Sequence, residues 1–249
     1  MSIYLGSQKI DNHKKLLIEG FSLEDGLIDR TIDNYIDDMC ETIEAHAFLA
    51  CTELSTVKCI NCSYIGSYAF SGCSNLVSVS FPKCSSISMC AFYKCSNLTT
   101  VNFPSCSYIG YYAFEFCSNL TSVNFPSCSY IGYYAFESCS NLTSVSFPNC
   151  SYIGNVAFGN CSNLTSINFP NCNYIGISAF YKCCNLITLD LVGISSVPTL
   201  STNAFSSTPI GGYSASAGQY GSVYVPASLY SSFLTATNWS LISSRIVSV

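Results

Sequence analysis

The stretch CSNLTSVNFPSCSYIGYYAF, residues 117–136, is one copy of a unit that returns every 22 residues. A fixed period of this length indicates a solenoid, in which each coil contacts only its neighbours. Function is therefore expected on a repeated surface and not in a single catalytic pocket. The most regular marker of the unit is the pair Ala-Phe, at residues 47–48, 69–70, 91–92, 113–114, 135–136, 157–158 and 179–180, with a looser copy at 204–205.

Each unit contains the signals for one strand and two bends. Val123 and Phe125 alternate with polar residues, which predicts a short strand with both apolar side chains on one side. Pro126 lacks a backbone donor, so the strand ends or turns there. Gly132 allows a second bend. The remaining residues, 133–139, are too few for a long helix and predict a helical turn or a 3₁₀ piece as the return limb.

Stacking of such coils accounts for the repeated apolar positions. Each Leu, Val, Phe and Ile then lies on its counterpart in the next coil, and full burial of one such side chain contributes about 1.5–3 kcal/mol. We therefore expect Phe103, Phe125 and Phe147 to lie one above another. The core explains these columns without any function.

The chain has 17 cysteines, most of them in two columns at the period. Neighbours in a parallel ladder are about 4.8 Å apart with parallel Cβ directions, whereas a disulfide needs Cβ atoms turned toward each other at about 3.8 Å. The sequence thus predicts buried thiols that act as small apolar groups. The columns are Cys51, Cys73, Cys95, Cys117, Cys139, Cys161 and Cys183, and Cys40, Cys62, Cys84, Cys106, Cys128, Cys150 and Cys172.

A metal site is the alternative for Cys59 and Cys62, which form a Cys-x-x-Cys pair. A closed zinc site needs a second such pair or a histidine pair. Cys59 also occupies the position that Phe81 holds in the next unit, so we interpret it as a core residue. No metal and no cofactor are predicted.

Composition excludes some classes of partner. Hydrophobic residues make up 49% of the chain and charged residues only 9%, with a net charge of −5. Nine Lys and Arg are too few for a basic stripe that would neutralise phosphates, so no nucleic-acid partner is expected.

No apolar run reaches the roughly 18–20 residues of a membrane span, so no membrane insertion is expected. The first residues lack the pattern of a secretory signal peptide, so work outside a cell would need a removed leader or another export route.

The unit resembles a leucine-rich repeat, and more closely the BspA-type subclass. The strand signature and the return limb match at Leu120, Val123, Phe125, Cys128, Ile131, Gly132, Ala135 and Phe136. The resemblance covers about residues 29–205 and departs at Glu44, Ser88 and Cys90. It implies an α/β leucine-rich-repeat solenoid, a right-handed coil with a parallel strand sheet on one face and short helical or 3₁₀ return limbs. We expect an N-terminal cap at 1–28, the solenoid at 29–205 and a C-terminal cap at 206–249.

The outward positions of the strand face are rich in hydroxyl and amide groups and almost free of charge. One interpretation is a ladder that suits the strand and keeps the protein soluble; the other is a face that binds a polar, uncharged target. The candidate residues are Thr100, Asn102, Ser122, Asn124, Ser144 and Ser146.

A second candidate surface is aromatic. The residue before the repeated Ile is usually Tyr and points away from the core if the chain there is extended. Exposed tyrosines offer apolar area and a hydroxyl at low entropy cost, which suits a protein or sugar partner. Packing between stacked tyrosines is the alternative. The candidate residues are Tyr64, Tyr108, Tyr130, Tyr152 and Tyr174.

Signals of catalysis are missing from the repeats. Only His13 and His46 could supply an imidazole, no Gly-x-Ser-x-Gly motif or phosphate loop is present, and no paired carboxylates are recognised. We therefore expect no enzyme but a recognition or adhesion module that binds a protein or glycan on a host or neighbouring cell. The resemblance implies a location outside the cell, at the surface of a bacterium or on a virus particle, with a cytoplasmic location left open. The alternative function is a structural spacer or a tail or fibre component of a phage.

Overall fold

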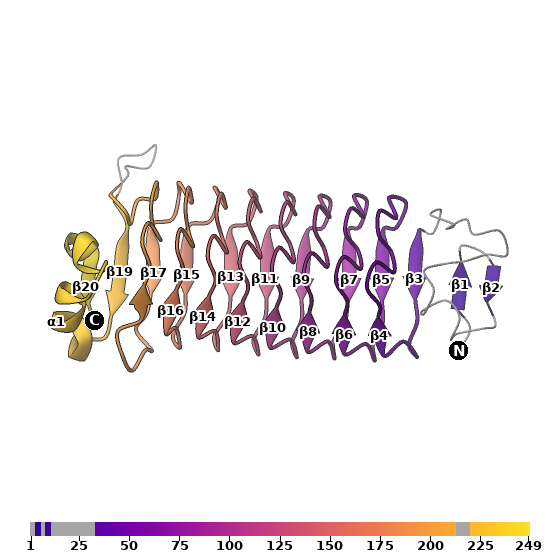
Figure 1. Ribbon diagram of the computed structural model, residues 1–249, viewed down its shortest axis with the longest axis horizontal. Helices are drawn as coiled ribbons and strands as arrows, with labels where there is room; N and C mark the ends of the chain where they lie inside the picture. Colours follow the sequence, from indigo (N-terminus) through magenta and orange to yellow (C-terminus); the bar gives the residue numbers. More distant parts are fainter. Residues whose placement is uncertain (1–2, 6–7, 11–32, 213–219) are drawn as a thin grey trace.

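The computed structural model describes residues 3–5, 8–10, 33–212 and 220–249. In these ranges the chain forms an elongated rod of stacked coils, with the strands lying across its long axis (Figure 1). Every described strand pair between residues 33 and 249 is parallel, and in the repeats the partners are 22 residues apart, as in the pairing of Val101, Val123 and Val145. The predicted leucine-rich-repeat solenoid is therefore confirmed.

One row of strands carries the predicted alternation, and from β3 to β17 the central residue of each strand is turned toward the core. The row is divided into three sheets, after β7 and after β13, and both of these strands read Ser-Val-Ser with a half-buried valine. The divisions thus follow the coils whose central side chain reaches the core least well. The strands are β3 (Asn34–Ile36), β5 (Thr56–Lys58), β7 (Ser78–Ser80), β9 (Thr100–Asn102), β11 (Ser122–Asn124), β13 (Ser144–Ser146), β15 (Ser166–Asn168), β17 (Thr188–Asp190), β19 (Ser222–Val225) and β20 (Ile246–Ser248).

A second row of two-residue strands forms one unbroken parallel sheet of eight strands. Its second residue, such as Ile131, is fully buried, and its first residue, such as Tyr130, faces outward. Sequence reasoning predicted one sheet only, because two residues give no alternation that could be recognised. The strands are β4 (Thr42–Ile43), β6 (Tyr64–Ile65), β8 (Ser86–Ile87), β10 (Tyr108–Ile109), β12 (Tyr130–Ile131), β14 (Tyr152–Ile153), β16 (Tyr174–Ile175) and β18 (Thr199–Leu200).

The return limb differs from the predicted helical turn or 3₁₀ piece. Single bonds of the 3₁₀ type are present, as from Glu137 N to Tyr134 O at 3.1 Å. However, Tyr134 and Ser138 both have a φ of 59°, in the left-handed region, so no helix continues through them. Amides between them point along the rod, as Phe136 N donates to Ala157 O of the next coil at 2.8 Å. The limb therefore ties neighbouring coils together instead of forming a helix.

Two columns of phenylalanine fill the core. Phe125 is fully buried and stacks on Phe103 and Phe147, with ring centroids 5.3 and 5.4 Å away. The second column passes beside it, since Phe114 and Phe136 stack at 5.2 Å and meet Phe125 edge-on at 6.0 and 6.2 Å. The expected vertical alignment of Phe103, Phe125 and Phe147 is confirmed.

The cysteine columns also lie as predicted, and all 17 cysteines are free thiols. In one column the thiols from Cys73 to Cys183 each donate to a carbonyl of the preceding coil, as from Cys139 Sγ to Phe114 O at 3.2 Å. In the other column the acceptor is two residues ahead, as from Cys128 Sγ to Tyr130 O at 3.3 Å. Burial raises the pKa of Cys128 to about 12. These thiols therefore stay protonated and serve as small core residues.

The C-terminal segment packs on the last coil. It contains the 3₁₀ helix η1 (Ala227–Leu229), the helix α1 (Tyr230–Thr235) and the 3₁₀ helix η2 (Ser240–Arg245) between β19 and β20. Trp239 is fully buried against Phe205 and Phe233, and its Nε1–H donates to Pro198 O at 2.8 Å. Since β19 pairs with β17, the strand row runs on beyond residue 206, and the boundary of a C-terminal cap stays a prediction.

At the other end, β1 (Ile3–Leu5) and β2 (Gln8–Ile10) form an antiparallel pair. Most of the predicted N-terminal cap, residues 1–28, lies outside the described residues. Its role therefore also stays a prediction.

Candidate recognition surface

The predicted tyrosine column forms a stacked ladder. Tyr108, Tyr130, Tyr152 and Tyr174 lie in register on consecutive coils, and their ring centroids are 5.0, 4.7 and 4.7 Å apart. We call these four residues the tyrosine ladder. They stack on each other, as the alternative interpretation expected, and they are also partly exposed. Binding of a partner by these residues stays a prediction. Both ring faces of Tyr130 and Tyr152 are covered by neighbouring rings, whereas Tyr108 and Tyr174 each have one such neighbour only. The middle of the ladder therefore presents ring edges and hydroxyl groups.

A shorter column runs beside the ladder. Tyr111 and Tyr133 stack at 4.9 Å, and the Tyr152 hydroxyl donates to that of Tyr133 at 3.4 Å. Burial, and then the neighbouring Tyr111 hydroxyl, raise the pKa of Tyr130. The Tyr130 hydroxyl therefore remains protonated at neutral pH and can both donate and accept. We call the ladder together with Tyr111 and Tyr133 the tyrosine face.

Tyr64 belongs to the same column but stands apart from the ladder. Ser86 lies between Tyr64 and Tyr108 in the register of the sheet. Tyr64 and Tyr108 are 41% and 38% exposed, more than Tyr130, Tyr152 and Tyr174. Tyr108 has no ring neighbour on the side of Ser86, and Tyr64 has none on either side, because Thr42 and Ser86 flank it. The Tyr64 hydroxyl accepts a hydrogen bond from Ser88 Oγ at 2.7 Å.

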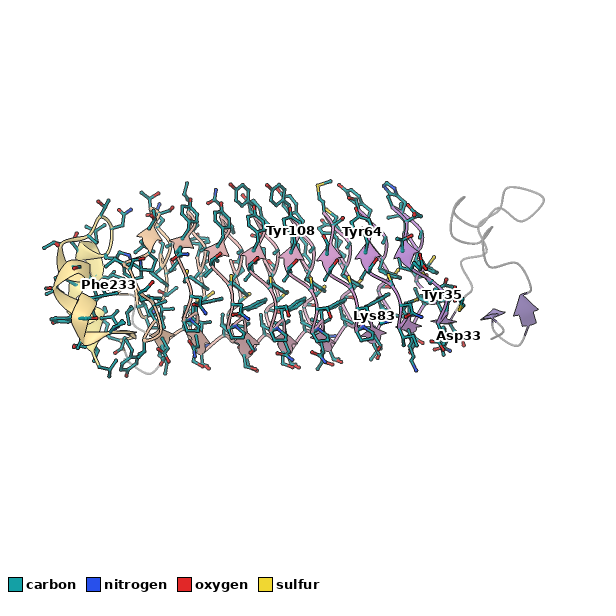
Figure 2. All side chains as sticks on the ribbon, turned by 90° about the horizontal axis from the view of Figure 1, so that it is seen from below. Asp33, Tyr35, Tyr64, Lys83, Tyr108 and Phe233 are labelled. Atoms are coloured by element: carbon teal, nitrogen blue, oxygen red, sulfur yellow. The ribbon has the colours of Figure 1, made fainter. Side chains whose placement is uncertain are left out.

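The strand-face candidates lie on the other row of strands and do not meet the tyrosines. Thr100, Asn102, Asn124, Ser144 and Ser146 are exposed and Ser122 is half-buried. Asn124 Nδ2 donates to Asn102 Oδ1 at 2.9 Å, so these amides already satisfy one another. In Figure 2, Tyr64 and Tyr108 lie along one side of the rod, away from Lys83, which follows the strand row. The predicted site residues thus form two separate surfaces.

The return limb contains a carboxylate pair that sequence reasoning missed. Glu115 is buried, and its burial, followed by the Glu137 carboxyl on the next coil, raises its pKa to about 7, although the Lys94 ammonium acts in the opposite direction. The statement that the repeats hold no paired carboxylates was wrong, because the two glutamates are one period apart and a shared column could have been recognised. Asn160 Nδ2 also donates to Glu137 Oε1 at 3.3 Å.

The Glu115 carboxyl is expected to make stability depend on pH. The native state keeps its proton up to about pH 7, whereas an unfolded glutamic acid releases it near its ordinary pKa of about 4.3. The native state binds more protons in that interval, so stability falls as the pH rises through it. In thermal melts from about pH 4 to pH 8, Glu115→Gln should flatten this decline and raise the melting temperature at the upper end. Glu53→Gln, at an exposed position, should leave the profile unchanged.

Neither His46 nor any group of possible metal ligands forms a second candidate site among the described residues. His46 stacks on Tyr68 at 5.3 Å, and His13 lies outside the described residues. Within the described ranges no three His, Cys, Asp or Glu side chains gather as metal ligands would. No described helix has the length and apolar character of a membrane span.

Comparison with known proteins identifies relatives of the repeat region. The profile of the family described as "BspA type Leucine rich repeat region (6 copies)" matches residues 31–142 and 85–211. No curated protein matches the sequence.

Similar solved structures share the repeat architecture at low identity. A leucine-rich repeat protein from Bacteroides ovatus is 19% identical over 84% of this chain and 63% of its own, with a TM-score of 0.46. One from T. pallidum is 24% identical over 68% and 73%, with a TM-score of 0.48. A leucine rich cell surface protein from Faecalibacterium prausnitzii is 22% identical over 84% and 62%, with a TM-score of 0.41. The chain spans less than two thirds of the length of the first and third of these proteins.

Proposed function

The chain belongs to the BspA-type leucine-rich-repeat family, and from this we propose that it is a non-catalytic recognition module that binds a protein through its tyrosine face. Leucine-rich-repeat proteins typically mediate protein–protein interaction or adhesion and are generally not enzymes. Display at the surface of a bacterium or a virus particle is part of the proposal. The finer points, namely the partner and the face that it contacts, rest on the geometry of the described residues.

The stacked tyrosines are the observation that carries the proposal. Their rings are held in place by their neighbours at 4.7–5.0 Å, so little side-chain entropy is lost when a partner binds. Ring edges give apolar contact, and protonated hydroxyls give hydrogen bonds. A sugar would stack on ring faces, and within the ladder these faces are covered except on one side of each end ring, Tyr108 and Tyr174. A protein surface is therefore the better match.

The strand face supports binding less well. Its amides bond to each other along the rod, as between Asn102 and Asn124, and it offers little apolar area. Its uncharged hydroxyl groups fit the role of a soluble outer surface.

A structural spacer is the second candidate function. The unbroken sheet from β4 to β18 favours it, because such a rod holds its two ends at a fixed separation. A rod of this kind needs no partner along its sides.

The proposal is tested by measuring how strongly the chain and its variants retain proteins from extracts of cell surfaces. The double variant Tyr130→Ser with Tyr152→Ser should retain a protein from host or neighbouring-cell surface extracts at least about tenfold more weakly than the wild type, since loss of buried aromatic side chains at an interface costs more than about 1 kcal/mol each. The fold should persist, because serine already occupies this column at Ser86.

The matched control is Asn102→Ser with Asn124→Ser, which copies the serines found at positions 80 and 146 of the same column. It should bind as the wild type does. Equal losses in both double variants would contradict the assignment to the tyrosine face. Retention on a glycan array with no protein retained would favour a glycan, and no retained partner of either kind would favour the spacer.

A further inference from the structure

One coil departs from the repeat at four positions on the tyrosine side. Ser86, Ser88, Met89 and Cys90 stand where the next coil carries Tyr108, Gly110, Tyr111 and Tyr112. The strand itself is intact, since β8 pairs with both β6 and β10, and Ile87 is fully buried. The coil therefore keeps its core and loses only its outer rings.

The consequence is a gap in a column of stacked rings. Tyr64 and Tyr108 flank Ser86 in the register, so their positions are two strand spacings apart, about 9.6 Å. The same two spacings in the intact ladder, from Tyr108 to Tyr152, are filled by one ring, that of Tyr130, at 5.0 and 4.7 Å from its neighbours. We call the position above Ser86, between Tyr64 and Tyr108, the missing rung.

We propose that the missing rung binds one aromatic side chain of a protein partner. This inference rests on the proposed function and gives it a specific contact. The incoming ring takes the place of Tyr130 in the intact ladder, at the centroid separation that aromatic pairs prefer. Tyr64 and Tyr108 are its two walls, and no ring of the coil between them covers the faces that they turn toward Ser86.

The surroundings of the missing rung suit a ring with a polar group. Ser86 is half-buried below it, and Ser88, whose hydroxyl bonds that of Tyr64, lies beside it. Met89 is 39% exposed in the same coil, and a methionine adapts its shape to an aromatic neighbour. No side chain of residues 86–90 carries a charge. Figure 2 shows Tyr64 and Tyr108 on the same side of the rod.

Filling the gap with the chain's own ring is the sharpest test. Ser86→Tyr should complete the column from Tyr64 to Tyr174 and exclude the ligand. Thr42→Tyr is the matched control, since Thr42 pairs with Tyr64 on its other side and the new ring leaves the missing rung open. The probes are N-acetyl-tryptophan amide and methyl β-glucopyranoside, measured by saturation-transfer NMR.

We expect the indole probe to bind wild type and Thr42→Tyr alike, and Ser86→Tyr at least tenfold more weakly. Equal binding to Ser86→Tyr, no binding to the wild type, or binding of the sugar alone would each overturn the proposal. If Ser86→Tyr does not fold, Tyr108→Ser and Tyr152→Ser replace it. Each of these variants removes one ring of the tyrosine ladder, but only Tyr108→Ser removes a wall of the missing rung. Only Tyr108→Ser should therefore lose binding of the indole probe.

The retention assay separates this inference from the proposed function. If Ser86→Tyr keeps its protein partner while the double Tyr130 and Tyr152 variant loses it, the missing rung is not the partner's site and the function stands. If the wild type retains no protein but binds the indole probe and Ser86→Tyr does not, the aromatic site stands and the proposed function fails.

Discussion

Replacing Phe125 by alanine is expected to lower the free energy of unfolding by about 3–5 kcal/mol, the range found for phenylalanine in well-packed cores. Phe125 is fully buried and contacts rings on both sides of its own column and two rings of the neighbouring column. Its removal leaves a void in the middle of the rod, where the coils on either side cannot approach because their backbones are hydrogen-bonded in register. Urea unfolding followed by circular dichroism measures the loss.

Phe116→Ala is the matched control for this prediction. Phe116 is 40% exposed on the return limb and contacts Tyr93 and Lys94 rather than the core. Replacing this side chain by alanine should lower the free energy of unfolding by less than about 1 kcal/mol, as for most surface substitutions. Because each coil contacts only its neighbours, the Phe125 variant should also unfold in two steps, one for each side of the void. Similar losses in the two variants would contradict a core built of continuous phenylalanine columns.

The fold was largely predictable because the same constraint is repeated in every coil. A single Val-x-Phe pair is weak evidence for a strand, but its return with Pro126 and Gly132 at fixed offsets leaves one arrangement in which all apolar groups are buried. The return limb was not predictable in the same way. Its left-handed residues include Tyr134 and Val156, types that rarely adopt positive φ, so no local signal marked them. In the return limb, the hydrogen bonds between neighbouring coils outweigh the preference of these residues for negative φ.

The candidate surface was predictable in its residues and not in its geometry. An extended chain at Tyr130 and Ile131 would place the tyrosine outward, as the structure has it, but whether such rings stack or stand free depends on the spacing of coils and the rotamers. The Glu115 and Glu137 pair was missed although the two residues are one period apart and the same in-register stacking was predicted for the phenylalanines. The irregular coil at Ser86 was visible in the sequence. That it leaves a gap in a column of rings could be recognised only from the positions of the rings on either side, Tyr64 and Tyr108.

The cysteines permit the second large prediction. Thiols react as thiolates, and a pKa near 12, as at Cys106, Cys128 and Cys172, lowers the thiolate fraction at neutral pH more than about a thousandfold below that of a free cysteine with a pKa of about 8.5. Burial is the main cause of each shift. Most of these side chains are also fully inaccessible, so reaction requires local opening of the rod. We therefore expect the native protein to resist alkylation.

Alkylation with iodoacetamide, followed by mass spectrometry, checks this expectation. In native buffer Cys184 should react first, because it is the only one of the 17 cysteines that is not buried, and the rest should remain unmodified for much longer. In denaturant all 17 should react together, without prior reduction, since none is in a disulfide. Cys184→Ser should abolish the fast phase and leave the slow one intact. Rapid native labelling at Cys117 or Cys139, or thiols that appear only after reduction, would contradict the stacked arrangement, because both residues are sealed on each side by the next coil.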